Sequence, residues 1–238
     1  MKALVIGYGR MGKMINEVLG DELAGNVALE CPCKTIKEFD KDFDVIIDFS
    51  NPANLDMIIS YVKETKKPVV FATTGYSDSQ LKEIDELSKV APVLRSANFS
   101  LGVIVLNRVV KEMSALLKDD YDIEVIEAHH NKKLDAPSGT AKMLIKSIVD
   151  ETGFSVNEGR NGICPRTKNE VGVSAIRGGT IPGIHQVMYC GEDEVLEFKH
   201  TAYSRRIFAT GAVKAAKWLL NQKPGFYDMN DVLFGENK

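Results

Sequence analysis

Short apolar runs alternate with stretches of helical periodicity through the first part of the chain. The apolar runs predict buried strands at Lys2–Ile6, Asn26–Glu30, Phe43–Phe49, Pro68–Ala72 and Pro92–Leu94. Between them apolar residues recur every three or four positions, as from Leu81 to Leu87, which predicts helices that pack on a core. Strands that alternate with helices in this way form a doubly wound parallel sheet, so an α/β fold is expected.

The pattern changes after Ser100, where longer helices and strands follow one another without regular alternation. Helices are expected at Leu101–Leu117, Gly139–Glu151 and Ser204–Leu220, and strands at Asp122–His130, Val171–Arg177, Ile184–Cys190 and Val195–Thr201. Residues 153–170 are rich in Gly, Asn and Pro, which predicts a loop. We expect a second α+β domain on a mainly antiparallel sheet, comprising 101–204, and a first domain comprising 1–100 plus 205–238.

Composition and charge exclude several classes of partner. The formal net charge of -3 provides no basic surface for a nucleic acid or an anionic membrane. The first apolar run ends at Ile6, too early for a signal peptide, and no segment has the length of a membrane span. The four cysteines form no CxxC pair, which favours free thiols in a reducing, cytoplasmic protein and argues against a metal site.

A glycine-rich loop directly follows the first strand and opens the first helix. Its G-x-G-x-x-G residues are Gly7, Tyr8, Gly9, Arg10, Met11 and Gly12. In a dinucleotide-binding turn the first glycine allows the tight bend, the second lets the backbone approach a pyrophosphate, and the third lets the helix pack on the strand. The motif therefore predicts a Rossmann-type domain that binds NAD or NADP.

The preference between the two nucleotides is open at the sequence level. Glu30 ends the second predicted strand, near the position where an acidic residue binds the ribose hydroxyls of NAD. Lys34 and Arg10 are cations that would instead favour the 2′-phosphate of NADP, although Lys34 is equally typical of a solvated loop lysine.

Two further loops follow predicted strands of the parallel sheet, at the edge where ligands bind in such sheets. Small residues and hydroxyls there suit a nicotinamide ribose that passes close to the backbone, although the same residues are typical of plain turns. These candidate cofactor contacts are Ala72, Thr73, Thr74, Ser96, Ala97, Asn98 and Phe99.

The segment Glu127–Ala141, EAHHNKKLDAPSGTA, concentrates candidate chemistry between a strand and a helix. His129 and His130 are adjacent at a strand end and should point to opposite faces, so one of them is expected to enter a cleft as a proton donor. Lys132 and Lys133 offer a cation, and spacing does not choose between them.

The helix start Ser138, Gly139 and Thr140 offers N–H groups to a carboxylate, or Ser138 simply caps its own helix. Arg177 is either a fork for a second carboxylate or a surface ion pair. His200 continues the face of Leu196 and Phe198, which favours a packed histidine.

At these motifs the chain resembles the dihydrodipicolinate reductase family, also called 4-hydroxy-tetrahydrodipicolinate reductase. The matching strings are GYGRMG, DFSNP, ATTG, SANFS, EAHHNKKLDAPSGTA and IRGGTIPG, and together they span nearly the whole chain. The resemblance implies an enzyme of lysine and diaminopimelate biosynthesis, with a Rossmann domain, a substrate and tetramerisation domain, and NADH or NADPH as hydride donor. A homotetramer is expected on this ground alone.

The resemblance also implies roles for individual residues. His129 matches the family's proton donor and acceptor, and Lys133 matches its second proton donor. His130, Gly139 and Thr140 match substrate-binding positions, and the glycine loop with the two further loops matches the cofactor contacts. Cys31 stands where an arginine is often found, so the nucleotide preference stays open.

The chemistry implied is reduction of a carbon–carbon double bond in a cyclic imine dicarboxylate, with His129 as general acid and Lys133 stabilising negative charge. One rival is another NAD(P)-dependent dicarboxylate dehydrogenase, which a substrate panel would identify. The other is a non-catalytic dinucleotide-binding redox sensor, which would need the glycine loop but not the histidine–lysine segment.

Overall fold

The chain divides into two compact units in the computed structural model, which describes residues 1–39 and 42–235. The first unit comprises Met1–Leu101 and the chain from Arg206 onward, and the second comprises Gly102–Arg205. The last residues of the first predicted domain, 236–238, lie outside the described residues.

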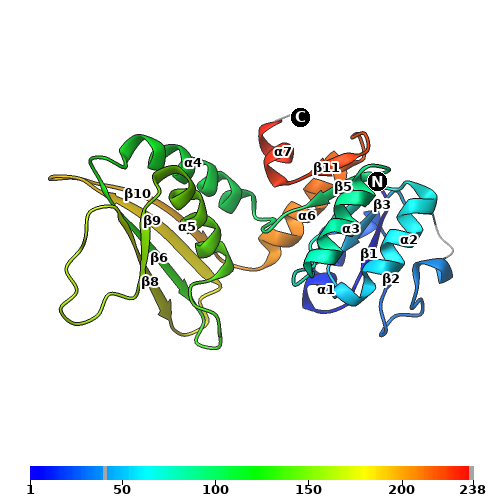
Figure 1. The fold of residues 1–238 in the computed structure, drawn as a ribbon. Coiled ribbons are helices and arrows are strands. Elements are labelled where there is room, and N and C mark those ends of the chain that lie inside the picture. The colour runs from blue at the N-terminus through cyan, green and yellow to red at the C-terminus, as the bar shows by residue number, and fades with distance from the viewer. Residues whose placement is uncertain (40–41, 236–238) are drawn as a thin grey trace. The chain divides into compact units, whose positions relative to one another are not determined.

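The first unit is built on a parallel sheet with the strand order β11-β5-β4-β3-β1-β2. Its central strands are buried on both faces, because helices cover both (Figure 1). The strands are β1 (Ala3–Ile6), β2 (Leu23–Val27), β3 (Val45–Asp48), β4 (Val69–Phe71), β5 (Pro92–Arg95) and β11 (Gly225–Tyr227).

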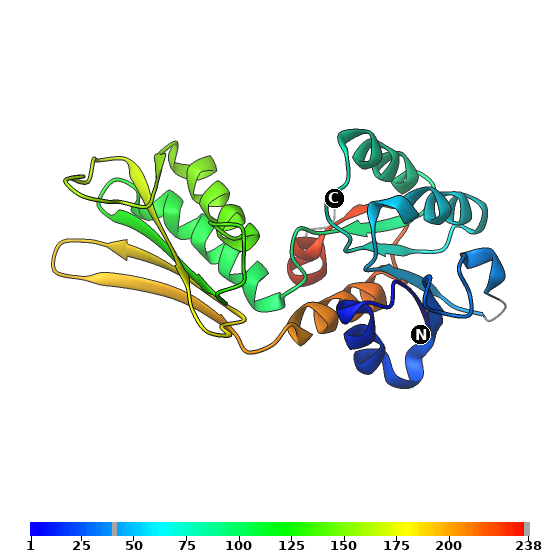
Figure 2. The ribbon, with the colours of Figure 1, turned by 90° about the horizontal axis from the view of Figure 1, so that it is seen from below.

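The helices of the first unit form two layers. Helices α1 and α6 pack together on one face of the sheet, and α2 and α3 lie side by side on the other (Figure 2). The helices are α1 (Arg10–Leu19), α2 (Leu55–Thr65), α3 (Asp78–Ser88), α6 (Arg206–Leu219) and α7 (Met229–Phe234). Short 3₁₀ turns occupy Gly20–Glu22, Ile36–Glu38 and Pro52–Asn54.

The second unit carries a five-stranded sheet with the order β10-β9-β6-β8-β7. Strand β9 is antiparallel to both of its neighbours, whereas β6, β8 and β7 are parallel to one another, so the sheet is mixed. The strands are β6 (Asp122–His129), β7 (Ser155–Glu158), β8 (Glu170–Arg177), β9 (Gly183–Cys190) and β10 (Val195–Ala202). The predicted fold class is confirmed, with the second sheet mixed rather than mainly antiparallel.

Helices α4 (Leu101–Leu117) and α5 (Gly139–Thr152) cover one face of this second sheet (Figure 2). Their apolar residues and the inward side chains of β6, β8 and β9 form the core, with Tyr189 fully buried in it. The opposite face carries side chains such as Ile176 and Val195, which are 51% and 53% exposed. Strand alternation places both on this outer face.

Two predictions about elements were wrong. Residues 153–170 were predicted as loop, but they contain β7, a polar edge strand that pairs with β8 only. The second strand was predicted at Asn26–Glu30, but β2 ends at Val27, so Glu30 lies in the loop that follows.

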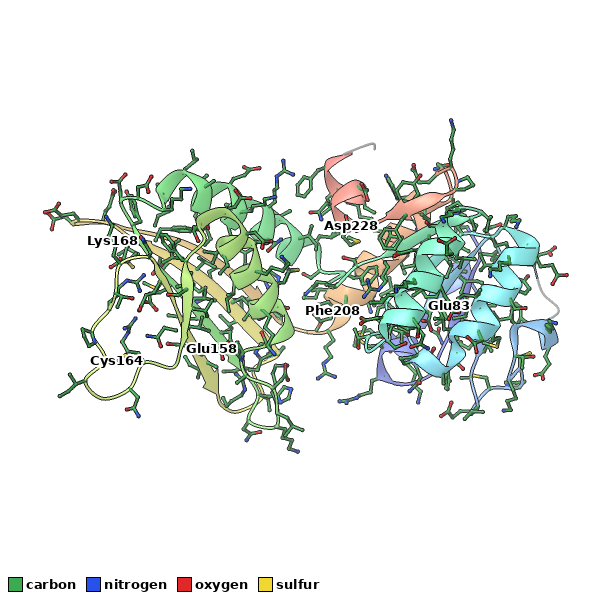
Figure 3. All side chains as sticks on the ribbon, in the orientation of Figure 1. Glu83, Glu158, Cys164, Lys168, Phe208 and Asp228 are labelled. Atoms are coloured by element: carbon green, nitrogen blue, oxygen red, sulfur yellow. The ribbon has the colours of Figure 1, made fainter. Side chains whose placement is uncertain are left out.

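A long loop, 159–169, connects β7 to β8, and Figure 3 labels Cys164 and Lys168 within it. The buried carboxylate of Glu170 holds this loop, because it binds the guanidinium of Arg160 and accepts a hydrogen bond of 2.7 Å from the hydroxyl of Thr167. These contacts hold the pKa of Glu170 at about 2.

Candidate active site

A buried carboxylate, Glu127, lies at the centre of the polar groups at the carboxyl end of β6. Strand alternation puts Glu127 and His129 on the same face, toward the helices. The side chain of Glu127 is fully buried, and its Oε2 atom lies 2.6 Å from Nδ1 of His129. The proton donor predicted from the sequence therefore has a carboxylate partner two residues before it in the chain.

Arg177, at the end of β8, binds both oxygens of Glu127. Its Nη1 and Nη2 atoms donate to Oε2 and Oε1 at 2.9 Å and 2.7 Å, and Nη2 also donates to the carbonyl of Asp135 at 2.6 Å. Burial alone would raise the pKa of Glu127, but the donors on Arg177 and His129 outweigh it and hold that pKa below its usual value. Of the two predicted alternatives for Arg177, the structure shows an ion pair, and its partner is a buried one.

Ser138 connects this carboxylate to the start of α5. Its backbone N–H donates to Oε1 of Glu127 at 3.0 Å, and its hydroxyl accepts a hydrogen bond of 3.1 Å from the N–H of Ala141. Ser138 is buried and caps its own helix, which was one of the two predicted alternatives. Gly139 is exposed and Thr140 is half-buried at the same helix start.

A second imidazole, His185, completes the cluster, although it lies outside the sequence motifs. It lies on β9 directly opposite Glu127, and its ring centroid is 5.1 Å from that of His129. Its Nε2 atom is 2.9 Å from the hydroxyl of Ser138. Burial lowers the pKa of His185 to about 4, so this ring is neutral at physiological pH.

The environment of His129 leaves one ring nitrogen available. Nδ1 is bound to Glu127, whereas Nε2 lies beside Gly183, where an added Cβ would be only 3.1 Å away. Burial lowers the pKa of His129, Glu127 raises it, and the cations of Lys133 and Arg177 lower it further, with a net shift below the ordinary value.

The two lysines of the segment have different environments. The side chain of Lys133 is 20% exposed, and its ammonium lies 2.8 Å from Asp135, which lowers the pKa of that carboxyl. Lys132 is exposed. The half-buried His130 accepts a backbone hydrogen bond from the N–H of Lys133 at 3.1 Å. The structure therefore distinguishes Lys133 from its neighbour by burial.

The glycine loop of the first unit has the geometry of a dinucleotide-binding turn. Gly7 has a φ of +107°, and an added Cβ would be 2.5 Å from the carbonyl oxygen of Phe49. A Cβ on Gly12 would be 2.5 Å from the carbonyl oxygen of Gly7, whereas one on Gly9 would meet nothing within 4 Å. The outer glycines are therefore needed for packing, and Gly9 leaves its surroundings open to a ligand.

A cavity of about 550 Å³ opens beside this loop. Its lining includes Gly7, Tyr8, Gly9, Glu30 and Lys34 among the predicted cofactor residues. Its volume suits the nucleotide half of a nicotinamide cofactor. Arg10, exposed, and Met11, half-buried, are the first residues of α1 and follow Gly9, the N-cap residue.

Lys34 and Glu30 have different environments within this cavity wall. The ammonium of Lys34 binds the backbone carbonyls of Leu29 and Cys31, so it closes the loop that follows β2. Glu30 is exposed. Burial raises the pKa of the neighbouring Cys31 thiol.

A second buried carboxyl, Asp48, organises the loops after β3 and β4. It accepts hydrogen bonds from the hydroxyls of Ser50 and Tyr76, the latter at 2.9 Å, while the N–H of Ser50 donates to the hydroxyl of Thr73 at 2.8 Å. Burial raises the pKa of Asp48. The contact with Ser50 thus holds the buried Thr73 in the loop after β4. In the same loop Ala72 is half-buried and Thr74 is exposed.

The loop after β5 is fixed by its own polar groups. The hydroxyl of Ser96 donates to the carbonyl of Asn98 at 2.8 Å, and the side chain of Asn98 accepts from the N–H of Ser100 at 2.8 Å. Phe99 is buried and its ring lies 6.0 Å from that of Phe49, whereas Ala97 is exposed.

Among the described residues, no three His, Cys, Asp or Glu side chains are grouped as they would be around a metal ion. Within the same residues, no helix is both long enough and apolar enough to cross a bilayer. The four cysteines are free.

Comparison with known sequences identifies the family. Residues 1–99 match the family model of the dihydrodipicolinate reductase N-terminus, and residues 102–233 match that of the dihydrodipicolinate reductase C-terminus. The chain belongs to the dihydrodipicolinate reductase family. The resemblance drawn from its motifs is confirmed, and the chain is an NAD(P)H-dependent oxidoreductase.

Individual relatives of this family match over nearly their whole length. The chain is 48% identical to the 4-hydroxy-tetrahydrodipicolinate reductase of Clostridium novyi (strain NT), with 96% of each chain covered. It is 42% identical to the enzyme of the same name from Clostridium tetani (strain Massachusetts / E88), with 98% of this chain and 97% of the relative covered.

Solved structures share the fold. A dipicolinate-bound dihydrodipicolinate reductase from Paenisporosarcina sp. TG-14 matches with a TM-score of 0.77 at 18% identity, covering 98% of this chain and 99% of that one. An engineered D-amino acid dehydrogenase bound to NADP+ matches with a TM-score of 0.54 at 14% identity, covering 96% and 93%.

Proposed function

We propose that this chain reduces 4-hydroxy-tetrahydrodipicolinate to tetrahydrodipicolinate, in lysine and diaminopimelate biosynthesis, with His129 as the proton donor. The observation that carries the assignment of His129 is the buried cluster of Glu127, His129 and Arg177 in a member of this family. The cluster presents one imidazole nitrogen, holds the other, and lies beside a helix start suited to a carboxylate.

The residues of the second unit supply the proton and the charge for this reaction. Loss of water from the 4-hydroxy compound leaves a carbon–carbon double bond. Reduction of that bond adds one hydride and one proton, and Nε2 of His129 delivers the proton. Burial lowers the pKa of His129, and a negatively charged dicarboxylate bound beside the ring would raise it again. Lys133 stabilises negative charge, and His130, Ser138, Gly139 and Thr140 position the substrate carboxylates.

A bound nicotinamide cofactor would supply the hydride. The open backbone at Gly9 and the cavity beside it fit the pyrophosphate and the nucleotide. Further contacts would come from Arg10, Met11, Gly12 and the loops at Ala72–Thr74 and Ser96–Phe99. The first unit is accordingly the dinucleotide-binding domain, and the second is the substrate-binding and oligomerisation domain.

The proposed hydride donor is NADH or NADPH. Glu30 lines the cavity and is exposed, so it can bind ribose hydroxyls. Lys34 lines the same cavity but is held by two carbonyl groups, so a 2′-phosphate would have to compete with them. Comparing kcat/KM for the two cofactors in the parent protein and in Lys34→Ala measures the contribution of this lysine to NADPH use.

The proposed assembly is a homotetramer in the cytoplasm. The outer face of the second sheet, with Ile176 and Val195 exposed, supplies apolar surface for association. The free cysteines are consistent with a reducing compartment.

The test is nicotinamide oxidation, followed by absorbance, with freshly generated 4-hydroxy-tetrahydrodipicolinate and each cofactor in turn. His129→Gln and Lys133→Ala should lower kcat by about 10²-fold or more. Lys132→Ala, which removes the exposed neighbouring lysine, is the matched control and should retain activity. Turnover by the parent protein on another dicarboxylate but not on this substrate would contradict the substrate, and near-normal turnover in both variants would contradict the roles of the residues.

A further inference from the structure

The two carboxylate oxygens of the buried Glu127 accept hydrogen bonds from three different elements. Oε2 accepts from His129 on β6 and from Arg177 on β8, and Oε1 accepts from Arg177 and from the backbone of Ser138 at the start of α5. An ion pair that served stability alone would need only the guanidinium. The additional donors are the proposed proton donor and the proposed carboxylate-binding helix start.

We propose that Glu127 is a positioning residue that fixes the tautomer and the orientation of His129, with Arg177 as the group that moderates its charge. The proposal rests on the proposed function of His129 as proton donor. Because the carboxylate accepts a hydrogen bond from Nδ1–H, the neutral ring carries its hydrogen on Nδ1 and keeps Nε2 as the exchanging nitrogen. Without this contact the ring could adopt either tautomer.

Titratable groups from β6, β8, β9 and the loop after β6 surround the ring of His129. Glu127 on β6 is an anion in direct contact with the ring, Arg177 on β8 and Lys133 in the loop after β6 are cations, and His185 on β9 is neutral. The negative charge of Glu127 stabilises the imidazolium, and the guanidinium fork of Arg177 weakens that effect. Glu127 and Arg177 together therefore allow His129 to be protonated and still to release its proton to the substrate.

The same carboxylate links protonation to substrate binding. Ser138 donates its N–H to Glu127 and immediately precedes Gly139 and Thr140, the predicted substrate contacts. A displacement of Glu127 would therefore move the ring of His129 and the first turn of α5 together. We expect changes at Glu127 to affect kcat and the KM for the substrate, with the KM for the cofactor unchanged.

The experiment compares Glu127→Gln with Glu124→Gln. Both residues lie on β6 and bind an arginine, but Glu124 pairs with Arg166 on the outer face of the sheet. The pH dependence of kcat is measured for each, because its alkaline limb reports loss of the protonated acid in the substrate complex. Glutamine keeps an acceptor oxygen but removes the charge, so the limb should move to lower pH by about one unit or more. In Glu124→Gln it should stay in place.

A second measurement does not depend on turnover or on a variant that folds. The ¹⁵N shifts of the His129 ring in the parent protein report which nitrogen carries the hydrogen. We expect the Nδ1–H tautomer in the neutral ring. The Nε2–H tautomer, or an unmoved alkaline limb in a folded Glu127→Gln protein, would overturn the positioning role. If the parent protein has no activity on the substrate, the proposed function fails, while the tautomer result still decides whether Glu127 fixes the ring.

Discussion

At the scale of single residues, the candidate chemistry depends on groups that the sequence did not single out. His129, Lys133 and the helix start at Ser138 were recognised, but Glu127 was not, because one acid on a strand looks like any other. The available indication was its spacing, since residues two apart on a strand share a face. His185 is farther along the chain, and only the pairing of β9 with β6 brings it to the site.

The space beside Nε2 of His129 leads to a prediction at Gly183. A methyl group there would lie 3.1 Å from Nε2, so Gly183→Ala should push the ring off its position. We expect kcat to fall by about tenfold, since small misplacements of a reacting group are costly. Gly178→Ala is the control, because a Cβ at that nearby loop position meets nothing within 4 Å. Equal activities for the two variants would show that the ring is not confined there.

Asp48 leads to a prediction about pH and stability. A carboxyl group whose pKa is raised on folding destabilises the folded state once the pH exceeds its unfolded value of about 3.9, because folding then opposes ionisation. Asp48→Asn should therefore raise the urea midpoint relative to the parent protein at pH 7, and the difference should shrink toward pH 4. A lower midpoint for the variant at pH 7 would mean that the ionised carboxylate stabilises the loops after β3 and β4.

At the scale of elements, strongly patterned segments were predictable and weakly patterned ones were not. Helix α4 was placed at its observed bounds because its apolar residues form a long periodic run. Strand β7 has only one strongly apolar residue, Val156, and lies at the sheet edge, so polar residues cost little there and the pattern is absent. The short elements β11 and α7 were not predicted either, because each contains too few residues to show a periodic pattern.

The loop between β7 and β8 allows a test in acid. The pKa of Glu170 is about 2, below the unfolded value of about 4.3, so its pairing stabilises the protein above pH 4 and is lost as the pH falls toward 2. Glu170→Gln should lower the urea midpoint at pH 7 and flatten its decline between pH 4 and pH 2. An unchanged acid profile would show that the contacts with Arg160 and Thr167 do not contribute to stability.

At the scale of the whole molecule, the alternation of strands and helices predicted the parallel sheet, and the change of pattern after Ser100 predicted a second α+β region. Both follow from short-range periodicity, which the sequence displays directly. The ammonium of Lys34 binds backbone carbonyls because of the tight turn that follows β2. Hydrophobic periodicity contains no information about the geometry of that turn. The nucleotide preference was left open for the same reason.

The outer face of the second sheet yields a prediction about assembly. Replacing the exposed Ile176 with lysine places a charge within that apolar surface, so Ile176→Lys should shift the mass measured by light scattering from a tetramer toward smaller species. Leu116→Lys is the matched control, because Leu116 is also exposed, at 71%, but belongs to α4 on the other side of the same sheet. Loss of the tetramer in the control alone would place the contact on the helices.

The insertion of the second unit within the first has a consequence for biosynthesis on the ribosome. Helix α6, which packs on α1 and on the parallel sheet, and the edge strand β11 are both translated after the whole of the second unit. The nascent first unit therefore waits with one face of its sheet covered by α1 but lacking α6 over β3, β4 and β5, while Gly102–Arg205 can already fold as a continuous segment. The segment encoded in the middle is expected to mature before the one that starts the chain, and the exposed sheet is where a chaperone would bind in the meantime.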